Sequence, residues 1–456
     1  MADIHSKLNK LALVSNFNLL INQYITILFS MNSRLSNVIH AQKAERDLLG
    51  SKESIAREQS PKLKGQLSSD LVKVITGPRR AGKSVLTFQV LKGLNFAYLN
   101  LEDNSLPQPV DGDDLFEAID EVYGTVDFYF FDEIQSLDRW EKWINKLHRR
   151  GKNIIITGSN SKLLSKELAT SLTGRFLQTE LFPFSFREFV EVPHYLRTPV
   201  TADVSRLEQL LFDQYLEQGG FPEINLSKID PRDYLKTLLD SIVLNDIINR
   251  YKIRSSSQVR SLMTLLINSV ASRFSARSLE RALEGALSIA TIQKFLGYFN
   301  EAYVLEDLPR YFHKTRERLK ADRKMYIIDN GFVTFAGSAA TSSKAKLLEN
   351  LAFIELRRRG LRAGIELFYY VTTTGYEVDF IMRNDGKTSE MYQVSLSLDS
   401  QKTLERELRS LEQAAEELKC KKLTLLVGEG HAQTLTSNKH QIEVIPMREW
   451  CLKNFS

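Results

Sequence analysis

Two segments of the sequence carry side chains that can bind a nucleoside triphosphate and its magnesium ion. Residues 77–84 read Gly-Pro-Arg-Arg-Ala-Gly-Lys-Ser, which fits the pattern GxxxxGK(S/T). The two glycines let backbone N–H groups fold around phosphate oxygens, and a helix that follows adds the positive end of its dipole. Lys83 is placed to reach the terminal phosphates and Ser84 to ligate Mg²⁺. The alternative is a glycine-containing turn with a surface lysine.

The complementary half is the apolar segment 128–131, which is followed by Asp132 and Glu133. Open α/β sheets bind ligands at the carboxyl ends of their strands, so this acidic pair is expected beside the phosphates. We expect Asp132 to hold Mg²⁺ through water and Glu133 to orient and deprotonate the attacking water. A strand followed by an acidic pair that only starts a helix is the alternative.

Two further segments supply candidate catalytic side chains. The apolar run 154–156 leads into Thr-Gly-Ser-Asn, so that Ser159 or Asn160 could sense the γ-phosphate. Arg175 follows a glycine and is a candidate for stabilising transition-state charge, in its own chain or in the neighbouring subunit of a homo-oligomer. An arginine that only forms structural salt bridges fits the pattern equally well. The predicted catalytic residues are Glu133, Lys83, Arg175 and Asn160, and the predicted nucleotide-binding residues are Gly77, Pro78, Arg79, Arg80, Ala81, Gly82, Lys83, Ser84, Val85, Asp132 and Ser159.

The pattern of apolar runs indicates how these segments are positioned. β-branched and aromatic runs alternate with helical stretches, as a parallel sheet with crossover helices requires. The expected strands of this sheet are 72–75, 96–101, 128–131 and 154–157, and the helix after the glycine-rich loop is 85–91. Later, a second α/β unit is expected with helices 347–358 and 403–419 and strands 367–372, 377–383, 391–397 and 422–427.

We therefore predict an α/β protein of four parts. They are an N-terminal helical appendage and linker (1–63), a parallel-sheet P-loop ATPase domain (64–200), a mainly helical region (201–340) and a smaller C-terminal α/β domain (341–456).

The composition is that of an ordinary globular protein. The 456 residues are 43% hydrophobic and 26% charged, and the net charge of +5 is compatible with a polyanionic partner. Two cysteines are too few for a disulfide framework, which favours a reducing, cytoplasmic location. The seven histidines are scattered, so no structural zinc is expected. The stretch 11–31 is too polar for a membrane span and is expected to be an amphipathic helix.

Five motifs resemble those of a widespread prokaryotic group of AAA-type ATPases. They are GPRRAGKS, FYFFDEIQSL, IIITGSNSKLL, LTGRF…ELFPFSFREF and GGFPE. The stretches FPFSFREF (182–189) and GGFPE (219–223) are more specific than the two nucleotide-binding motifs. The resemblance covers roughly residue 71 to the C-terminus. It implies an AAA+ or STAND-like ATP switch, followed by a winged-helix segment and a C-terminal region of uncharacterised function, with a role in defence, mobile-element or signalling systems.

Residues 275–295 look like the two helices of a helix-turn-helix, the second of them capped by Ser288. The next segment, 304–328, resembles a wing, and its tip is rich in basic residues. Such a unit reads the major groove with its second helix and contacts phosphates with its wing. An internal lid that contacts the nucleotide or a partner domain is the alternative. The predicted contacts to double-stranded DNA are Thr291, Gln293, Lys294, Lys314, Arg316, Arg318 and Lys320.

The last part follows the order of a PD-(D/E)xK nuclease-like fold. Glu349 on its first helix and Asp379 on its second strand match the metal ligands of active members. Gln393 stands where an acid belongs, and Ser395 stands where lysine belongs. Glutamine keeps a carbonyl oxygen for a metal, but serine cannot supply a cation beside the scissile phosphate. We therefore expect impaired or lost cleavage. In a working enzyme, Glu349, Asp379 and Gln393 would hold the metal.

Together these patterns favour an ATPase that uses Mg²⁺ and whose nucleotide state controls a DNA-binding, nuclease-like C-terminal half. Two alternatives stay open. One is a signalling scaffold that holds ATP and docks a protein partner, and the other is an ATP-regulated metal-dependent nuclease.

Overall fold

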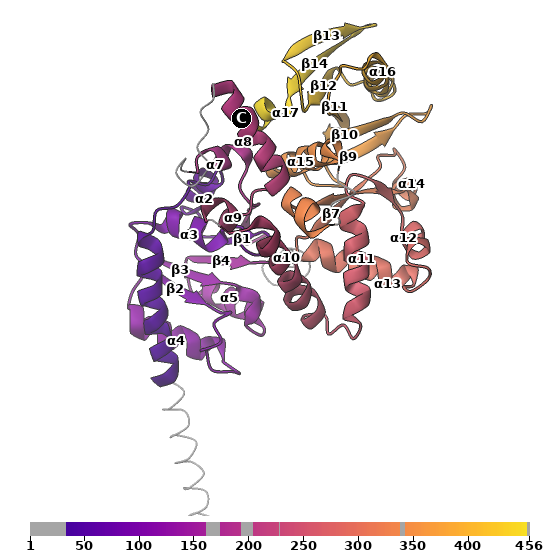
Figure 1. Cartoon of the computed structure of the whole chain (residues 1–456). Coiled ribbons are helices and arrows are strands. Elements are labelled where there is room, and N and C mark those ends of the chain that lie inside the picture. Colours follow the sequence, from indigo (N-terminus) through magenta and orange to yellow (C-terminus); the bar gives the residue numbers. More distant parts are fainter. Residues whose placement is uncertain (1–32, 161–173, 193–203, 228, 338–342, 454–456) are drawn as a thin grey trace, which may run out of the picture.

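The computed structural model describes residues 33–160, 174–192, 204–227, 229–337 and 343–453. One parallel sheet with its helices lies to one side, and the middle and C-terminal parts lie together on the other (Figure 1). The expected amphipathic helix at 11–31 falls outside the described residues. Within the described ranges, no helix is both long enough and apolar enough to cross a bilayer.

The ATPase part is built on five parallel strands in the order β2-β3-β4-β1-β5. The α/β fold with a parallel sheet is therefore confirmed, and the four expected strands are present within one residue of their predicted ends. A fifth strand, β5, was not expected. The strands are β1 (Val72–Thr76), β2 (Phe96–Asn100), β3 (Phe128–Asp132), β4 (Ile154–Gly158) and β5 (Phe176–Glu180).

Both faces of this sheet are covered by helices, which explains why β2, β3 and β4 are almost continuously apolar. On β1, Val74 faces a core that it shares with α4 and α5, whereas Ile75 faces a second core that it shares with α2 and α3. The covering helices are α2 (Ser60–Gln66), α3 (Lys83–Leu91), α4 (Gly112–Tyr123) and α5 (Trp140–Arg149), and a short 3-10 helix, η1 (Ile134–Ser136), follows β3.

Part of the expected N-terminal appendage, 1–63, is integral to the ATPase part. Residues 33–51 form a helix whose Leu35 and Ile39 lie in the core beneath the sheet. The charged segment that follows contains Arg57, which is 4% exposed. The expectation of an appendage and linker is therefore wrong for 33–63, because a charged composition does not show which of its side chains are buried against a distant part of the chain.

The middle part is mainly helical, as expected, and ends in a small antiparallel sheet of order β6-β8-β7. Ser288 caps α13 by accepting a hydrogen bond from the backbone N–H of Thr291, as the sequence predicts. The expected wing is an antiparallel hairpin of β7 and β8, but its tip contains a short helix, α14. The elements are α7 (Phe186–Val190), α8 (Val204–Gln218), α9 (Pro222–Leu226), α10 (Pro231–Ser241), the π-helix η4 (Ile242–Asn249), α11 (Ser256–Asn268), β6 (Arg273–Phe274), α12 (Ala276–Ala282), α13 (Ile289–Glu301), β7 (Leu305–Pro309), α14 (Thr315–Lys320), β8 (Arg323–Ile327) and the π-helix η5 (Phe332–Ala336).

The C-terminal part is a mixed six-stranded sheet of order β13-β14-β12-β11-β10-β9. Its first two helices and first four strands match the predicted ones, whereas β13, β14 and α17 were not expected. The helix α16 packs on one face of the sheet. Its apolar side chains and those of the strands form a separate hydrophobic core. The elements are α15 (Lys344–Arg358), β9 (Leu367–Val371), β10 (Glu377–Asn384), β11 (Lys387–Ser395), α16 (Gln401–Leu418), β12 (Lys422–Val427), β13 (Gln433–Ser437), β14 (His440–Pro446) and α17 (Met447–Leu452).

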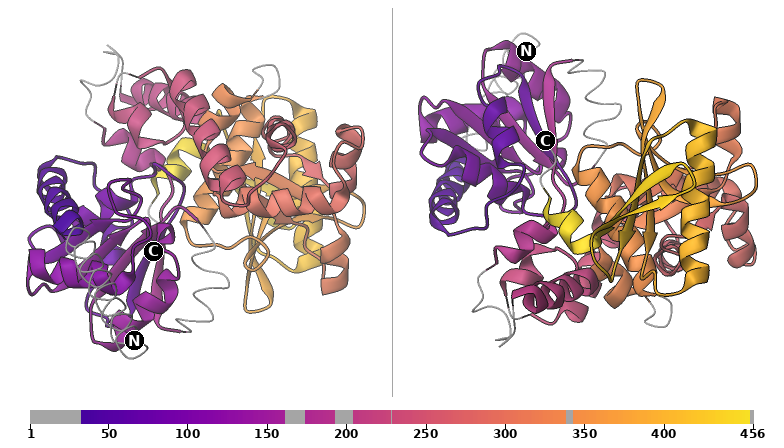
Figure 2. Two further views of the ribbon diagram at one scale, coloured as in Figure 1. Left: turned by 90° about the horizontal axis from the view of Figure 1, so that it is seen from below. Right: turned by 90° about the horizontal axis from the view of Figure 1, so that it is seen from above.

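One continuous hydrophobic core joins the end of the ATPase part to the middle part and to one side of the C-terminal part. This core includes Phe186 of α7, Phe299 of α13, Phe353 of α15 and Trp450 of α17. The last helix, α17, lies between the ATPase part and the C-terminal sheet (Figure 2) and packs on α7 and α8. The middle and C-terminal parts therefore pack directly against the end of the ATPase part.

Candidate nucleotide-binding site

The glycine-rich loop leaves β1 and enters α3 with an unusual backbone. Gly77, Arg80 and Gly82 have φ angles of 150°, 66° and 93°. A Cβ atom on Gly77 would lie 2.0 Å from the carbonyl oxygen of Leu181, so this close approach requires glycine. No side chain among the described residues caps the first turn of α3. The first N–H groups of this helix are therefore left to bind an anion.

Asp132 is held at the end of β3 by two hydroxyl groups. Ser84 Oγ donates a hydrogen bond of 2.6 Å to Asp132 Oδ2, and Thr157 Oγ1 donates to Oδ1. Burial raises the pKa of the Asp132 carboxyl to about 6, and the neighbouring charge of Glu133 adds to this effect. Ser84 and Asp132 are the pair expected to bind Mg²⁺, and their contact brings an oxygen from the loop and an oxygen from the strand to one point.

Lys83 and Glu133 face each other across the same site. Lys83 Nζ donates to the carbonyl oxygens of Gly77 at 3.2 Å and Pro78 at 3.1 Å, and it lies 3.6 Å from Glu133 Oε1. The Lys83 side chain is only 3% exposed. The ammonium thus contacts the carbonyl oxygens of its own loop, and these neutral contacts can be exchanged for phosphate oxygens without breaking a short ion pair.

Glu133 is oriented by the residues at the end of β4. It adopts a left-handed backbone with φ of 50°, and its backbone N–H donates to Thr157 Oγ1 at 3.1 Å. Its carboxylate accepts hydrogen bonds from the Gln135 side chain and from the backbone N–H of Ser159. Burial alone would raise the pKa of Glu133, but the Lys83 charge and these hydrogen bonds lower it below its usual value. The carboxylate is therefore ionised and can accept a proton.

Ser159 lies beside this carboxylate because β4 is inserted between β1 and β3, and Asn160 follows Ser159 at the end of β4. They are 1% and 6% exposed, respectively. The structure thus brings both residues to the edge of the sheet that carries the loop and the acidic pair, where the sequence predicted them.

The structure places Arg175 away from this site. It immediately precedes β5, is exposed, and its carbonyl oxygen accepts from the backbone N–H of Val72 at the start of β1. The glycine-rich loop follows the opposite end of β1, about 16 Å away at ~3.3 Å per strand residue. The prediction that Arg175 stabilises transition-state charge within its own chain is therefore wrong, because β5 runs parallel to β1.

Arg57 contacts the glycine-rich loop and stabilises its position. No feature of the sequence around Arg57 indicates this role. Its guanidinium donates to the carbonyl oxygens of Ala81 and Phe182, both at 2.7 Å, and to Glu188 Oε1 at 3.0 Å. Glu188 in turn completes a capping box with Ser185 at the start of α7. The specific FPFSFREF stretch therefore has a physical role, because it anchors the arginine that holds the phosphate loop.

Arg79 connects the loop to the middle part. Its Nε and Nη2 atoms donate to both carboxylate oxygens of Asp246 on η4, at 2.9 and 3.1 Å, and its Nη1 atom donates to Glu102 at 2.8 and 2.9 Å. Asp246 is 3% exposed and also lies 3.5 Å from Arg250. These contacts link the loop directly to a π-helix, an element often found at functional sites.

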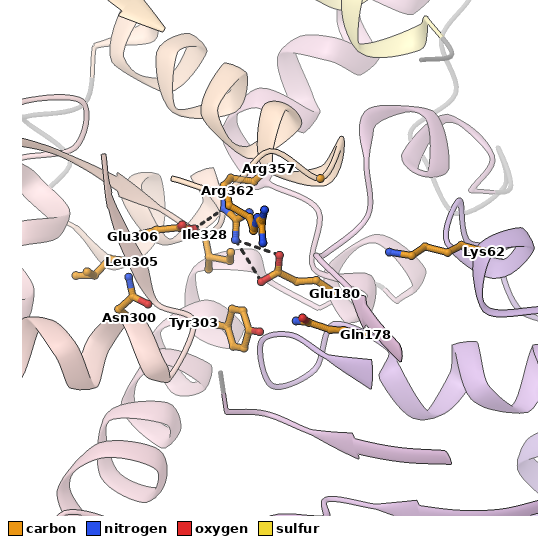
Figure 3. Close-up of a pocket in the computed structure, with 11 residues that line it drawn as sticks. Lys62, Gln178, Glu180, Asn300, Tyr303, Leu305, Glu306, Ile328, Arg357 and Arg362 are labelled. Carbon is orange, nitrogen blue, oxygen red and sulfur yellow. Dashed lines mark hydrogen bonds and ion pairs between the residues drawn. The ribbon is translucent and has the colours of Figure 1, made fainter. Parts of the chain in front are cut away.

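Arg357 connects the ATPase, middle and C-terminal parts of the chain at a second junction. From α15 it binds Glu180 of β5 at 3.0 Å and Glu306 of β7 at 2.7 Å. Figure 3 shows this arginine between the two carboxylates, at the wall of a cavity of about 320 Å³. The Tyr303 side chain and Gln178 line the same cavity. The two glutamates raise the pKa of Arg357 despite its burial, so its positive charge is fixed.

The predicted DNA contacts differ in how accessible they are. Gln293 and Lys294 on α13 are exposed, as are Lys314, Arg316 and Lys320 at the hairpin tip. Thr291 instead shares a hydrogen bond with the hydroxyl of its cap, Ser288. Arg318 turns inward, because its Nε atom donates to the carbonyl oxygen of Phe312 at 2.7 Å and its guanidinium lies over Tyr311 and Phe368. Arg318 is therefore not placed to contact DNA.

The predicted metal ligands of the C-terminal part lie together around a lysine. Lys324 Nζ is 2.5 Å from Glu349 Oε1 and 3.0 Å from Asp379 Oδ1. The expected third ligand, Gln393, uses Oε1 to accept from the backbone N–H of Asp379 and Nε2 to donate to Glu407. Within the described part of the chain, no group of three or more His, Cys, Asp and Glu side chains is arranged to hold a metal.

The parallel sheet, the glycine-rich loop and the acidic pair define an AAA-type, P-loop ATPase-like protein. Residues 69–190 match the family described as an AAA domain. Residues 209–343 and 344–450 match two domains of unknown function, DUF8612 and DUF4143.

Two relatives match this chain over most of their length. The chain is 36% identical over 404 residues to the uncharacterized protein MJ1544 of Methanocaldococcus jannaschii, a match that covers 85% of this chain and 89% of the relative. It is 31% identical over 347 residues to an uncharacterized protein of Haemophilus influenzae, covering 73% and 83%. This chain belongs to their family. In this chain, the AAA domain precedes the two domains of unknown function.

Solved structures resemble the chain more distantly. The Walker-type ATPase PABY2304 of Pyrococcus abyssi is 17% identical, with 62% of this chain and 95% of that chain covered and a TM-score of 0.43. A STAND protein with a tetratricopeptide repeat sensor from Pyrococcus horikoshii is 12% identical, with 67% and 46% covered and a TM-score of 0.28. Both scores are too low to bear on function.

Proposed function

We propose that this chain hydrolyses ATP with Mg²⁺, that its nucleotide state controls the middle and C-terminal parts, and that the middle part binds double-stranded DNA. The observation that carries the first step is the contact between Ser84 and Asp132. It brings a loop hydroxyl and a buried carboxylate together, and such a pair supports the proposal of a magnesium ion bound to the phosphates. When bound, Mg²⁺ would neutralise charge on the phosphate oxygens.

The side chains of this site have separable roles in hydrolysis. Lys83 exchanges its two loop carbonyls for phosphate oxygens and neutralises their charge. Glu133 is ionised and held by Gln135 and the Ser159 N–H group, so it can orient a water molecule and accept its proton. Asn160 follows β4, the strand that lies between β1 and β3. This buried residue is our candidate for contact with the γ-phosphate.

Two ion-pair junctions support control of the remaining parts by the nucleotide. Asp246 holds the loop residue Arg79 from the middle part, and Arg357 holds β5 from the C-terminal part. A phosphate that draws Arg79 toward itself would compete with Asp246 for the same guanidinium. The nucleotide would thereby shift η4, which packs directly on α10 and α11.

DNA binding is supported by the order of elements in the middle part. The helices α11, α12 and α13 and the antiparallel strands β6, β7 and β8 follow the arrangement of a winged helix, with α13 as its second motif helix. Both α13 and α14 lie on the side away from the ATPase sheet (Figure 1). The exposed cations Lys294, Lys314, Arg316 and Lys320 suit contact with phosphates.

The decisive experiment measures ATP turnover by the wild type and Glu133→Gln, alone and with duplex DNA, single-stranded DNA or RNA. The mass of the ATP-bound particle, recorded in parallel, reports whether a homo-oligomer forms. We expect turnover that depends on Glu133 and rises with duplex DNA, and DNA affinity that falls steeply with salt. A matched pair of variants, Lys314→Ala and Lys62→Ala, tests whether the hairpin tip is the contact.

Absence of turnover in the wild type would overturn the ATPase proposal. ATP binding without turnover would instead favour a signalling scaffold that holds ATP and docks a protein partner. Turnover without stimulation by DNA and without salt-sensitive DNA binding would overturn the proposal that the middle part binds DNA. Both cysteines, Cys420 and Cys451, are buried and unpaired, which agrees with our proposal of a cytoplasmic location.

A further inference from the structure

The side chain of Lys324 reaches from the middle part of the chain into the C-terminal part. It belongs to β8 of the middle part, yet its ammonium lies among carboxylates of the C-terminal part: Glu349 on α15, and Glu377 and Asp379 on β10. The distances from Nζ to the nearest oxygens of these three residues are 2.5, 2.7 and 3.0 Å. The Lys324 side chain is 3% exposed. An ammonium has three N–H donors, so all of them are satisfied by carboxylates.

The carboxylates are also engaged by groups other than Lys324. Tyr326 donates a hydrogen bond of 2.8 Å to the oxygen of Glu349 that binds Lys324. The second oxygen of Asp379 accepts from the backbone N–H of Val394 at 3.0 Å, and Glu377 forms a further ion pair with Arg273. These donors compete directly with a metal for the oxygens that a metal would need. The residues present therefore do not fit a divalent cation in this arrangement.

We infer that the ammonium of Lys324 takes the place of the metal in this nuclease-like cluster, so that the carboxylates fasten the C-terminal part to β8 instead of binding a divalent cation. The lysine absent at position 395 is thus not simply lost. A lysine is present, but it comes from a different part of the chain and sits at the centre of the cluster.

Charge and chemistry explain why the two occupants exclude each other. A divalent cation close to the carboxylates would lie within a few ångströms of the Lys324 charge, and repulsion at that distance in a buried site is strong. The ammonium is also held in place, because three carboxylates lie within 3.0 Å of Nζ.

The rival arrangement has Lys324 acting beside a metal, as the lysine of an active nuclease does. It needs at least two carboxylate oxygens that turn away from the ammonium and toward a shared ion. The two arrangements differ in a measurable way. If the ammonium replaces the metal, removing it creates metal affinity; if it assists a metal, the wild type already has that affinity.

The first measurement uses the full chain carrying Asp132→Asn, which weakens the separate metal site of the nucleotide loop. Mn²⁺ is titrated and followed by electron paramagnetic resonance, and supercoiled plasmid is incubated with the wild type and Mn²⁺. We expect no Mn²⁺ binding that depends on Asp379, and no cleavage. Binding that disappears in Asp379→Asn, or cleavage that does, would overturn the inference.

The second measurement removes the ammonium. Lys324→Met should lower the melting temperature, and Mn²⁺ should then raise it in a dose-dependent way that the wild type does not show. Adding Glu349→Gln in the double variant should recover part of the stability and weaken the Mn²⁺ effect. Lys320→Met, a change of an exposed lysine on α14, is the matched control and should show neither effect.

Each outcome of the second measurement either supports or overturns the inference. If Lys324→Met does not fold without metal, recovery of soluble protein with Mn²⁺ in the refolding buffer supports the inference. If Lys324→Met folds but Mn²⁺ has no effect on its melting temperature, the carboxylates are not a cation site and the inference fails. The inference does not rest on ATP hydrolysis, so its failure and failure of the proposed ATPase activity are distinguishable.

Discussion

Two buried lysines in this chain meet carboxylates in opposite ways. Lys83 lies 3.6 Å from Glu133 and donates to two backbone carbonyl oxygens of a loop, whereas Lys324 lies within 3.0 Å of three carboxylates. The first lysine is held by weak, neutral acceptors that a phosphate can displace. The second is saturated with charged acceptors. The same side-chain types therefore make an open ligand site in one part of the molecule and a closed structural junction in another.

The strongest test of this contrast removes the saturated lysine. We expect Lys324→Met to lower the free energy of unfolding by about 3 to 5 kcal/mol, because it leaves buried carboxylates without a counter-charge. Chemical denaturation of the full chain measures this loss. The control is Lys314→Met, whose side chain is 81% exposed and whose loss should change stability by less than about 0.5 kcal/mol. Equal effects of the two variants would remove the distinction between the clusters.

The acid of the open site should matter for rate and not for binding. We expect Glu133→Gln to slow ATP turnover by about 1,000-fold, equivalent to about 4 kcal/mol, because glutamine cannot accept the proton of the attacking water. Binding of a fluorescent ATP analogue should change little. Glu121→Gln, at an exposed position of α4, serves as the control. Retained turnover in Glu133→Gln would show that another group is the base.

Removing the lysine of the open site should give the reverse profile of Lys324→Met. We expect Lys83→Met to weaken ATP binding by about 100-fold, or about 3 kcal/mol, because a fixed positive charge at the phosphates is lost. Its effect on unfolding should be smaller than that of Lys324→Met, since only one long ion pair is broken. Titration of nucleotide alongside denaturation measures both quantities, and a large loss of stability with unchanged affinity would contradict the contrast.

The smallest effect is expected where the open site meets the middle part. Asp246→Asn keeps the shape of the side chain but removes the charge that Arg79 binds, and should cost about 2 kcal/mol of stability. It should also reduce any response of ATP turnover to DNA. The matched change, Asp240→Asn, affects an aspartate that is 50% exposed and should be near neutral. An unchanged response to DNA in Asp246→Asn would show that coupling does not pass through Arg79.

Local features of the fold were predictable because each is contained in a few neighbouring residues. The glycine-rich loop between a strand and a helix needs only the segment around Lys83, and Asp132 follows directly from the apolar run before it. The cap of α13 by Ser288 is likewise a contact three residues long. Hydrophobic periodicity gave the strands of the parallel sheet, since strands buried on both faces are continuously apolar.

Residues that act across long separations were not predictable in this way. Arg57 looked like part of a charged linker, although it meets Glu188, 131 residues away. Lys324 looked like one basic residue of a wing, although it is bound by Asp379, 55 residues away. A charged residue reads the same in the sequence whether its side chain is solvated or buried. Its distant partners distinguish the two states, and the local sequence pattern does not indicate which residues those partners are.

By itself, the sequence determined that this chain has a phosphate loop, an acidic pair and an α/β fold, because these depend on residue types and short spacings. Tertiary structure alone decided which of the predicted side chains meet. Strand order inserts β4 between β1 and β3, which brings Ser159 to Glu133, while the parallel alignment of β5 with β1 carries Arg175 to the opposite edge. Strand order and direction arise from how distant segments pack together, and packing is a property of the whole chain.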